Sequence, residues 1–412
     1  MSSSSPECVC TMDRCRQLPS VAFALVLPAL VATPAQGRTE PSLTVDMSVF
    51  ASPDPLLLSG SGNGAVMFEI AASPGVTITT DRGSTIALNG TLKRRDFSRL
   101  YGHYLLGDAT VETRYRDSEY LTIGGSAGFD RALAIDLLST SADLAVDPGA
   151  IRNSWFAGFD ADWRPNAFEL FRPEIRFDET FYSGGELLRD SRALAVGLAY
   201  SKRIGPRTSV GVRVRDTVNR VDGMASMNSI AAYGTYNRRF SGNGRFMLEL
   251  GAERAGRQIE TIGGMAMRRP GRTLLAGRVD LCRDAATGSR GMTACLSGTL
   301  NTEVSGVGGL RRNATVSASL MQPLGEKFVL RGSGDYRRST LVGGSRATGP
   351  PDLERSGPTD AMRGTVALDW KPRRDFTVTA SVQYLRRQVV TGQRIGAAFF
   401  GIQLSYRPGE RK

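Results

Sequence analysis

The chain has 412 residues, of which 41% are hydrophobic and 22% charged, and its formal net charge is +12. That length suffices for two or three soluble domains or for one large barrel. Beyond the N-terminal segment there is no run of 18 or more apolar residues, which excludes a bundle of membrane-spanning helices. A membrane β-barrel remains open, because its strands of about ten residues alternate apolar and polar side chains.

The first 35 residues have the order of a secretory signal. Arg14 and Arg16 form a basic start, residues 21–32 form an apolar core too short to span a bilayer as a helix, and Ala35 is a small residue that suits signal peptidase. We therefore predict a signal peptide in residues 1–35. A periplasmic N-terminal segment in residues 36–63 and an outer-membrane β-barrel in residues 64–412 would follow. A short buried helix is the alternative interpretation of the apolar core.

From residue 84 onward, segments of about ten residues alternate apolar and polar side chains. In residues 192–203, for example, Leu194, Val196 and Leu198 share one face, whereas Ala195 and Gly197 lie on the other. This period of two is typical of strands whose faces meet different surroundings. A further hairpin in residues 64–80 would raise the strand count from sixteen to eighteen, and single-chain bacterial barrels have even numbers. The sixteen strands are predicted near 84–94, 107–116, 119–130, 153–163, 166–178, 192–203, 207–219, 227–239, 244–257, 271–282, 292–304, 311–321, 327–339, 361–371, 375–388 and 395–407.

The connections between these strands alternate in length. Segments such as 204–206 and 372–374 are short and contain the Gly and Pro of tight turns, whereas 132–152, 179–191, 258–270 and 340–360 are longer and polar. Outer-membrane barrels have short periplasmic turns and long extracellular loops. The segment 132–145 is rich in Leu and Ala for an external loop, so we predict that it folds inward.

The two strand faces predict an orientation opposite to that of a soluble protein. The face of Leu194, Val196, Leu198, Val366 and Leu368 is expected to meet lipid, with aromatic residues near the short turns forming an interfacial girdle. The opposite face is too charged for a dry core and requires a wet lumen. An extracellular β-sandwich or solenoid is the alternative, although a solenoid should show a fixed repeat and none is found. The charged face carries Glu112, Arg114, Arg116, Asp160, Asp162, Arg213, Arg215, Glu249, Glu253, Arg278, Asp280, Glu303, Arg331, Asp335, Arg337, Arg363 and Asp369.

The final strand has the order of a terminal assembly signal. Gly401, Leu404 and Tyr406 follow the pattern of Gly, two residues, an apolar residue, one residue and an aromatic residue. With this strand, residues 64–412 resemble the porin-like outer-membrane β-barrel families of proteobacteria, some members of which are linked to surface-polysaccharide systems. The tail of residues 407–412 departs from the many members that end on the aromatic residue itself.

The resemblance implies an all-β fold, a transmembrane antiparallel up-and-down barrel in the outer membrane of a Gram-negative bacterium. Its partners would be outer-membrane lipid, lipopolysaccharide and the barrel-assembly machinery. The basic charge does not indicate nucleic acid as a partner, because the basic residues are spread among strands without an aromatic–basic motif. The separation of signal and first strand is too short for a plug domain, which argues against an energy-coupled transporter.

The sequence contains few candidate catalytic residues. His103 is the single histidine and lies in a predicted connection, which disfavours a Ser-His-Asp site. Asp160 and Asp162 share one strand face, but neighbouring arginines favour an ion-pair network over acid–base work. With no P-loop and no Cys-x-x-Cys pair in the sequence, we predict no enzymatic activity, no cofactor and no metal site.

Arginines on the predicted lumen face give the one positive indication of function. Arg213, Arg215, Arg331, Arg337 and Arg363 are the candidate lumen-lining residues, and rings of basic residues favour anions in pores. The predicted function is a passive pore or export conduit, with an anionic solute or polysaccharide as cargo. A structural or adhesin-like barrel with a closed lumen, and the barrel component of an exopolysaccharide secretion system, are the alternatives. In either alternative, the charged residues of the inner face would only keep the barrel wall hydrated and rigid.

Two cysteines follow the predicted signal peptide. Cys282 ends one predicted strand and Cys295 begins the next, with twelve residues between them. An even pair in an exported chain indicates a disulfide, which would lie near the periplasmic rim. Two unrelated thiols are the alternative.

Overall fold

The structure is a computed structural model of the chain. It describes residues 37–57, 64–99, 101–137, 149–183, 188–222, 226–240, 243–256, 258–262, 265–269, 271–285, 291–304, 310–342, 359–388 and 393–409. The predicted signal peptide therefore lies outside the described residues. No helix among the described residues is long and apolar enough to cross a membrane.

The described residues form antiparallel strands and one four-residue 3₁₀ helix, η2 (Ala134–Leu137). The strands are β1 (Gly37–Ser52), β2 (Ala65–Thr80), β3 (Thr85–Phe97), β4 (His103–Arg116), β5 (Leu121–Leu133), β6 (Ile151–Asn166), β7 (Glu169–Ser183), β8 (Ser191–Gly205), β9 (Thr208–Val221), β10 (Met227–Arg239), β11 (Gly244–Ala255), β12 (Gln258–Ile262), β13 (Met265–Arg269), β14 (Arg272–Arg283), β15 (Thr293–Val304), β16 (Leu310–Pro323), β17 (Phe328–Leu341), β18 (Thr359–Arg373), β19 (Phe376–Gln388) and β20 (Arg394–Tyr406).

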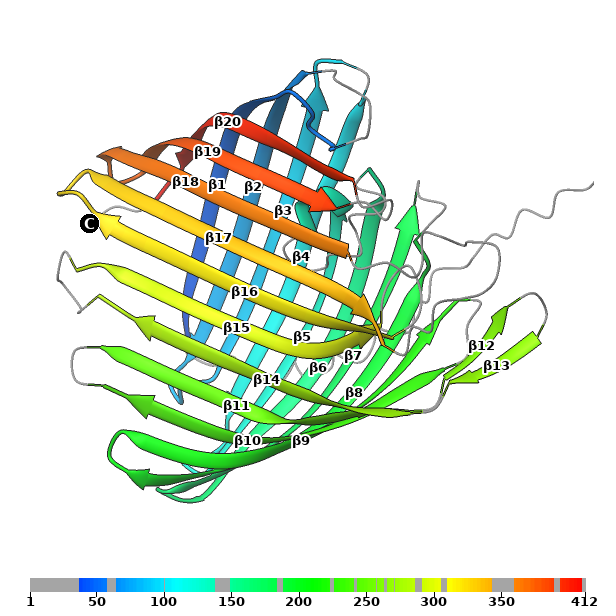
Figure 1. The fold of residues 1–412 in the computed structure, drawn as a ribbon. Helices are drawn as coiled ribbons and strands as arrows, with labels where there is room; N and C mark the ends of the chain where they lie inside the picture. The colour runs from blue at the N-terminus through cyan, green and yellow to red at the C-terminus, as the bar shows by residue number, and fades with distance from the viewer. Residues whose placement is uncertain are drawn as a thin grey trace, which may run out of the picture.

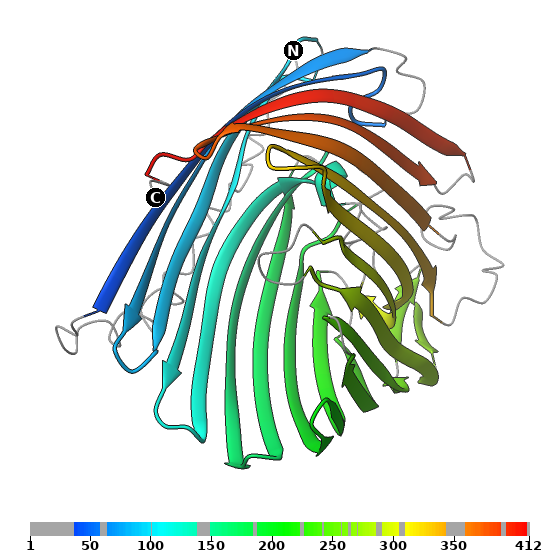
Figure 2. The same ribbon diagram turned by 90° about the vertical axis from the view of Figure 1, so that its left-hand side faces the viewer.

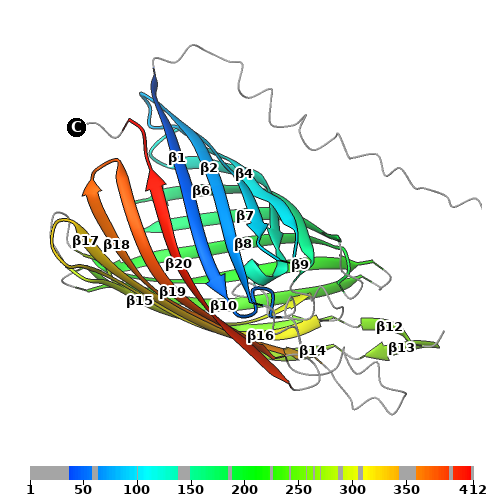
Figure 3. The ribbon, with the colours of Figure 1, turned by 90° about the horizontal axis from the view of Figure 1, so that it is seen from above.

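Eighteen of these strands form one closed sheet in which each strand pairs with its neighbours in the chain. The ring closes where β1 pairs with β20, for example Val45 opposite Tyr406 and Val49 opposite Ile402. Figure 3 shows β1 between β20 and β2, and in Figure 2 the blue first strand and the red last strand meet at this seam. The fold is thus an all-β, closed antiparallel up-and-down barrel, which eliminates free sheet edges along the paired lengths.

The strand count of eighteen is the higher of the two predicted values, and the prediction misplaced one strand. Residues 65–80 form a single strand, β2, rather than a hairpin, and its partner β1 lies in residues 37–52. The assignment of residues 36–63 to a periplasmic segment is therefore wrong for β1. Leu43, Val45 and Met47 alternate there with polar residues, and their pairing with β2 and β20 completes the ring.

A short hairpin formed by β12 and β13 lies outside the main sheet, within the predicted long connection 258–270. It projects from one end of the barrel (Figure 1) and so marks the end that carries the long connections. We call this the long-loop end and the opposite one the short-turn end. The connections at the long-loop end follow β1, β3, β5, β7, β9, β11, β15, β17 and β19.

The two faces of the wall differ as the alternation predicts. Arg213 on β9 contacts Glu174 on β7 and Glu249 on β11, and side chains of such non-neighbouring strands converge only on the concave, inner side. Ala195 shares this face and is 5% exposed, whereas Val366 on the other face is 59% exposed. Leu194, Val196, Leu198, Val366 and Leu368 all lie on the outer face, and all are exposed.

Candidate functional site

The candidate site is the inner surface of the barrel, and its most ordered part is an apolar cluster at the long-loop end. We call this the mouth cluster. Leu188 in the β7–β8 connection and Ala361 on β18 belong to it, although β8 and β18 lie on opposite sides of the ring. Its members therefore extend across the barrel mouth. The buried members are Leu56, Leu57, Leu106, Leu133, Ala134, Ile135, Ala150, Leu188, Ala361, Leu385, Ala397 and Phe399.

The connection after β1 contributes the centre of the mouth cluster. Leu57 is fully buried and has a left-handed backbone, with φ of 51°, in a turn closed by its N–H donating to the Asp54 carbonyl at 3.3 Å. The buried guanidinium of Arg387, on β19, donates to the Leu57 carbonyl from Nε at 2.9 Å and from Nη2 at 2.5 Å. Because this charged group holds a main-chain oxygen, Leu57 is fixed to the wall of the barrel.

The connection after β5 contributes the second inward element. Leu133, Ala134 and Ile135 are buried where η2 begins, and the Ala134 N–H donates to the Ala150 carbonyl at 2.8 Å. The Asp136 carboxylate is 3.0 Å from Nη1 of Arg95, whose Nη2 is 2.8 Å from Glu69. The prediction that segment 132–145 folds inward is confirmed for residues 132–137, and residues 138–145 lie outside the described residues.

A second apolar cluster lies over the other side of the mouth. Val221, Met227 and Ala255 come from β9, β10 and β11, and they pack with Leu310 of β16 and Val342 after β17. These strands lie three to six positions apart in the ring, so this cluster also joins separate parts of the wall. At the long-loop end, the inner face therefore carries two apolar clusters beside a few buried, hydrogen-bonded arginines such as Arg387.

A polar chamber of about 290 Å³ lies on the barrel side of the second cluster. Asn219 and Ser229 line it, two residues from the cluster members Val221 and Met227 on the same strand faces. Glu253 is 4% exposed and accepts a hydrogen bond from the Thr302 N–H at 2.9 Å. The chamber is also lined by Asp178, Thr180, Ala193, Arg215, Thr217, Ala231, Tyr233, Asn301 and Glu303.

Of the five candidate lumen arginines, two lie on β9. Arg213 and Arg215 share the inner face of that strand. Arg213 is held between Glu174 at 2.6 Å and Glu249 at 3.8 Å, so carboxylates offset its charge. Arg215 lines the polar chamber, and its buried Nε has no hydrogen-bond partner within the described part of the chain.

The other three candidate arginines lie on β17 and β18, across the lumen from β9. Arg331 is near the short-turn end and pairs with Asp369 at 2.6 Å. Arg363 lies opposite Asp335 in the β17–β18 register, and Arg337 follows Asp335 by two residues on the same face. With the Gln383 amide oxygen turned toward Arg363, the guanidinium donates to it at 2.9 and 3.3 Å. The five arginines thus occupy two walls at different heights and do not form one ring.

Ion pairs continue along the inner wall. Arg172 pairs with Asp162 at 2.5 Å, Arg114 lies 3.8 Å from Asp160, and Arg278 pairs with Asp280 at 2.7 Å. Charges of both signs are therefore interleaved, which keeps the polar surface hydrated while limiting its net preference for either sign.

The remaining predicted residues lie at the short-turn end and at the seam. Cys282 and Cys295 face each other in the β14–β15 register, with Cα atoms 4.1 Å apart, and the structure joins them as a disulfide. Leu404 and Tyr406 are exposed on the outer face of β20. Gly401 lies on the inner face opposite Phe50, and a Cβ there would overlap the Phe50 ring.

Residues for metal binding are not gathered in the described ranges. No group of three or more His, Cys, Asp or Glu side chains could hold a metal ion there. His103 begins β4 on the outer face, rather than lying in a connection. Sequence reasoning missed the Leu56–Leu57 pair of the mouth cluster. The signal was present as three consecutive leucines, residues 56–58, in a segment otherwise rich in Ser, Gly and Pro.

Comparisons with known proteins add similarity in fold only. No protein family and no curated protein matches the chain. The unliganded ferric citrate transporter FecA has a TM-score of 0.48 and 12% identity over 89% of this chain and 78% of its own. OpdO of Pseudomonas aeruginosa has a TM-score of 0.45 and 9% identity over 90% and 97%. The outer membrane protein opdK, from the same species, has 0.44 and 10% over 90% and 98%. Similarities of this size carry no argument about what this chain does.

Proposed function

We propose that the chain is an outer-membrane barrel that acts as a passive pore or export conduit for polar solutes, without catalytic chemistry. One observation carries the proposal: a closed ring of eighteen strands has an apolar outer face and a charged inner face. Exposed Leu, Val, Ile and aromatic side chains around a barrel suit a hydrocarbon environment, and the charges inside require water. A hydrated lumen through a membrane is a pathway for solutes that lipid excludes.

The inner wall supports only a mild charge preference in the proposed pore. Carboxylates accompany Arg213 and Arg331 at 2.6 Å, so the lumen offers few unpaired cations in the described residues. An anionic solute remains the proposed cargo because Arg215 lines the polar chamber without an ion pair there. A polysaccharide cargo would need a wide path past the mouth cluster. No feature of the described inner wall specifically favours such a cargo.

Planar-bilayer recording tests the proposal directly. The mature protein, refolded in detergent and inserted into bilayers, should show discrete conductance steps in KCl, with a weak anion preference in a salt gradient. A barrel of similar mass but known to be closed provides the baseline. Stable insertion without conductance steps, under any voltage applied, would contradict a pore that is open in the native protein.

A barrel with a closed lumen is the second candidate, and the mouth cluster favours it. That cluster joins opposite walls, and Arg387 fixes its member Leu57 at the start of the β1–β2 connection. In this case conductance should be absent from the native protein and should remain absent when the cluster is disrupted. Conductance that appears only after disruption would instead indicate a pore that is closed at rest.

A further inference from the structure

Four arginines gather on the inner side of the short-turn end, on or beside four strands that are consecutive in the ring. Arg203 lies near the end of β8, on the face that also carries Ala195. Arg239 ends β10 and lies directly opposite Arg245, near the start of β11. The Arg207 carbonyl, in the turn before β9, accepts a hydrogen bond from the Arg239 N–H at 2.8 Å. We call these four residues the rim arginines, and all of them are exposed.

The rim arginines are not neutralised by carboxylates within the described part of the chain, where none of the four makes an ion pair. Arg331, on the inner face of another wall at this end, by contrast pairs with a carboxylate at 2.6 Å. The carboxylates closest in register to Arg245 are Asp280 and Asp284. Asp280 is engaged by Arg278 at 2.7 Å, and Asp284 makes no ion pair with a rim arginine. The rim arginines therefore present four positive charges to the lumen.

Placing these cations side by side lowers the stability of the barrel. Like charges directly opposite each other on antiparallel strands are destabilising. Arg239 has Arg245 opposite it on one side and Arg207 beside it on the other. The Arg245 guanidinium is held on the inner face by a weak contact from Nη2 to Cys282 Sγ at 3.9 Å. An arrangement that costs stability in the empty barrel is typical of a functional site, where a bound anion would offset the repulsion.

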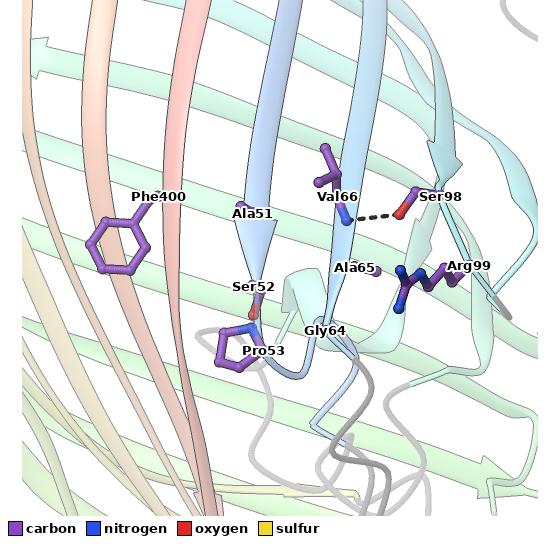
Figure 4. A pocket seen from close by; sticks show the side chains of 9 residues that line it. All are labelled: Ala51, Ser52, Pro53, Gly64, Ala65, Val66, Ser98, Arg99 and Phe400. Carbon is purple, nitrogen blue, oxygen red and sulfur yellow. Dashed lines mark hydrogen bonds between the residues drawn. The ribbon is translucent and has the colours of Figure 1, made fainter.

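A recess at the opposite end shows how an isolated cation differs from this arrangement. It has a volume of about 380 Å³ and lies at the seam, at the long-loop end of β1, β2 and β20 (Figure 4). Ala51, Val66 and Phe400 supply apolar surface, and among the described residues that line the recess Arg99 is the one with a charge. That single guanidinium can contact one anionic group. The rim arginines offer four guanidinium groups within three strand spacings, or about 14 Å.

We propose that the rim arginines bind solutes that carry two or more phosphate or carboxylate groups, where such solutes enter the barrel from the periplasm. The guanidinium fork matches two oxygens of one such group at once. Neighbouring strands lie about 4.8 Å apart, so adjacent rim arginines can hold adjacent anionic groups of one molecule at high effective concentration. The proposal rests on the proposed function, which places the short-turn end in the periplasm, and it narrows the cargo to multivalent anions.

The inward position of the rim arginines favours a solute over a docked protein. Arg239 shares a face of β10 with Tyr233, which lies opposite the inward Arg213. A protein resting on the rim would contact inward and outward cations alike, whereas a solute inside the barrel contacts the inward ones alone. A cleft lined by charges of one sign also raises the local concentration of the opposite ion. The outward cations at the same end include Lys202, Arg238 and Arg283.

The test compares two triple variants of the mature protein refolded in detergent, each lacking three positive charges at the short-turn end. The rim variant combines Arg207→Gln, Arg239→Gln and Arg245→Gln on the inner side. Binding of inorganic triphosphate and of inorganic phosphate is titrated by calorimetry at about 0.1 M KCl, where charges more than about 10 Å apart are screened. The control variant combines Lys202→Gln, Arg238→Gln and Arg283→Gln on the outer face.

The native protein should bind triphosphate at least about tenfold more tightly than phosphate, because a second guanidinium contact forms within the same complex. The rim variant should bind triphosphate about tenfold more weakly than the native protein or worse, since charge-assisted contacts are lost. The control variant should bind both anions as the native protein does. The comparison of the two anions uses the native protein alone, so that result does not depend on the folding of a variant.

Equal affinity of the native protein for the two anions would overturn the proposal. Equal losses of triphosphate affinity in the rim and control variants would also overturn it, because they would indicate a general attraction to the basic end, such as a docked acidic protein would use.

Conductance is recorded on the same preparations in planar bilayers, with triphosphate added to one side at a time. In a conducting channel, triphosphate should reduce the current at a lower concentration from one side than from the other, because the rim arginines lie at one end. A conducting channel without a preference for triphosphate refutes the site and leaves the proposed function intact. A preference for triphosphate without conductance supports the site and contradicts an open pore.

Discussion

The two ends of the barrel use the same alternating strands but place different chemistry on their inner faces. At the short-turn end, Trp163 and Trp370 lie on the outer face, and Arg172 and Arg331 are paired with carboxylates inside. At the long-loop end the inner face instead carries the two apolar clusters, whereas outward cations occur at both ends, such as Arg338 at this end and Arg238 at the other. The difference shows that the inner face is polar where it contacts water and apolar where it contacts protein. Inner residues at the mouth contact folded-in loops rather than water.

The largest expected effect comes from disrupting the mouth cluster at the long-loop end. Leu57→Asp places a carboxylate in the mouth cluster, and its left-handed φ of 51° suits Asp better than Leu. A buried, unpaired charge costs several kcal/mol, so the loop should leave the cluster and conductance should rise at least about tenfold. The measurement is single-channel current in planar bilayers.

The matched control makes the same change at the other end. Leu324→Asp lies in the exposed β16–β17 turn and should leave the current unchanged. Equal currents from both variants and the native protein would mean that the mouth cluster does not limit passage.

A substitution on the outer wall tests the assignment of the two faces. Val366→Arg should lower the free energy of unfolding by about 2–4 kcal/mol in lipid, because it puts a guanidinium on the apolar face. Arg363→Leu on the same strand removes an inner-face charge and should change that free energy less. Urea titration of tryptophan fluorescence in lipid vesicles gives both values. If Val366→Arg leaves the unfolding free energy unchanged and Arg363→Leu lowers it severely, the assignment of the two faces is wrong.

The disulfide at the short-turn end should contribute about 3 kcal/mol, since it closes a loop of about fourteen residues in the denatured chain. Cys282→Ser combined with Cys295→Ser should lower the unfolding free energy by up to that amount. Mass spectrometry of unreduced protein from the outer membrane should find one linked peptide pair. Two alkylatable thiols in that sample would refute both the bond and its contribution.

The smallest effect is expected from the inner-wall arginines. Changing Arg213, Arg215 and Arg363 to Ser should shift the reversal potential of an open channel toward cations. The shift should be modest, because Glu174 and Glu249 already offset Arg213. Arg215→Ser alone should account for most of it. If reversal potentials do not move in a conducting channel, arginine has no part in selectivity.

The sequence predicted those parts of the fold that depend on local alternation. Each of the sixteen expected strands has a counterpart, because a period of two is visible wherever the two faces meet different surroundings. The inward turn at residues 133–137 was visible as Leu and Ala in an otherwise polar connection. The relative heights of residues on distant strands could not be predicted from the sequence. Arg213 and Arg331 lie at different heights because the register between distant strands is set by the tilt of the whole barrel.

The seam between the first and last strands affects whether two copies of the chain can associate through their strand edges. Pairing with β20 begins at Val45, so residues 37–44 of β1 extend past the last strand and, among the described residues, pair with β2 alone. That overhang exposes one row of main-chain donors and acceptors, to which a strand of another molecule could add. Pro41 removes one donor from it, and Arg38 and Glu40, joined at 2.7 Å, place charges along it. Pro41, Arg38 and Glu40 therefore make β1 look unlike a strand in the sequence. The same residues disfavour the pairing of its free edge with a strand of a second barrel.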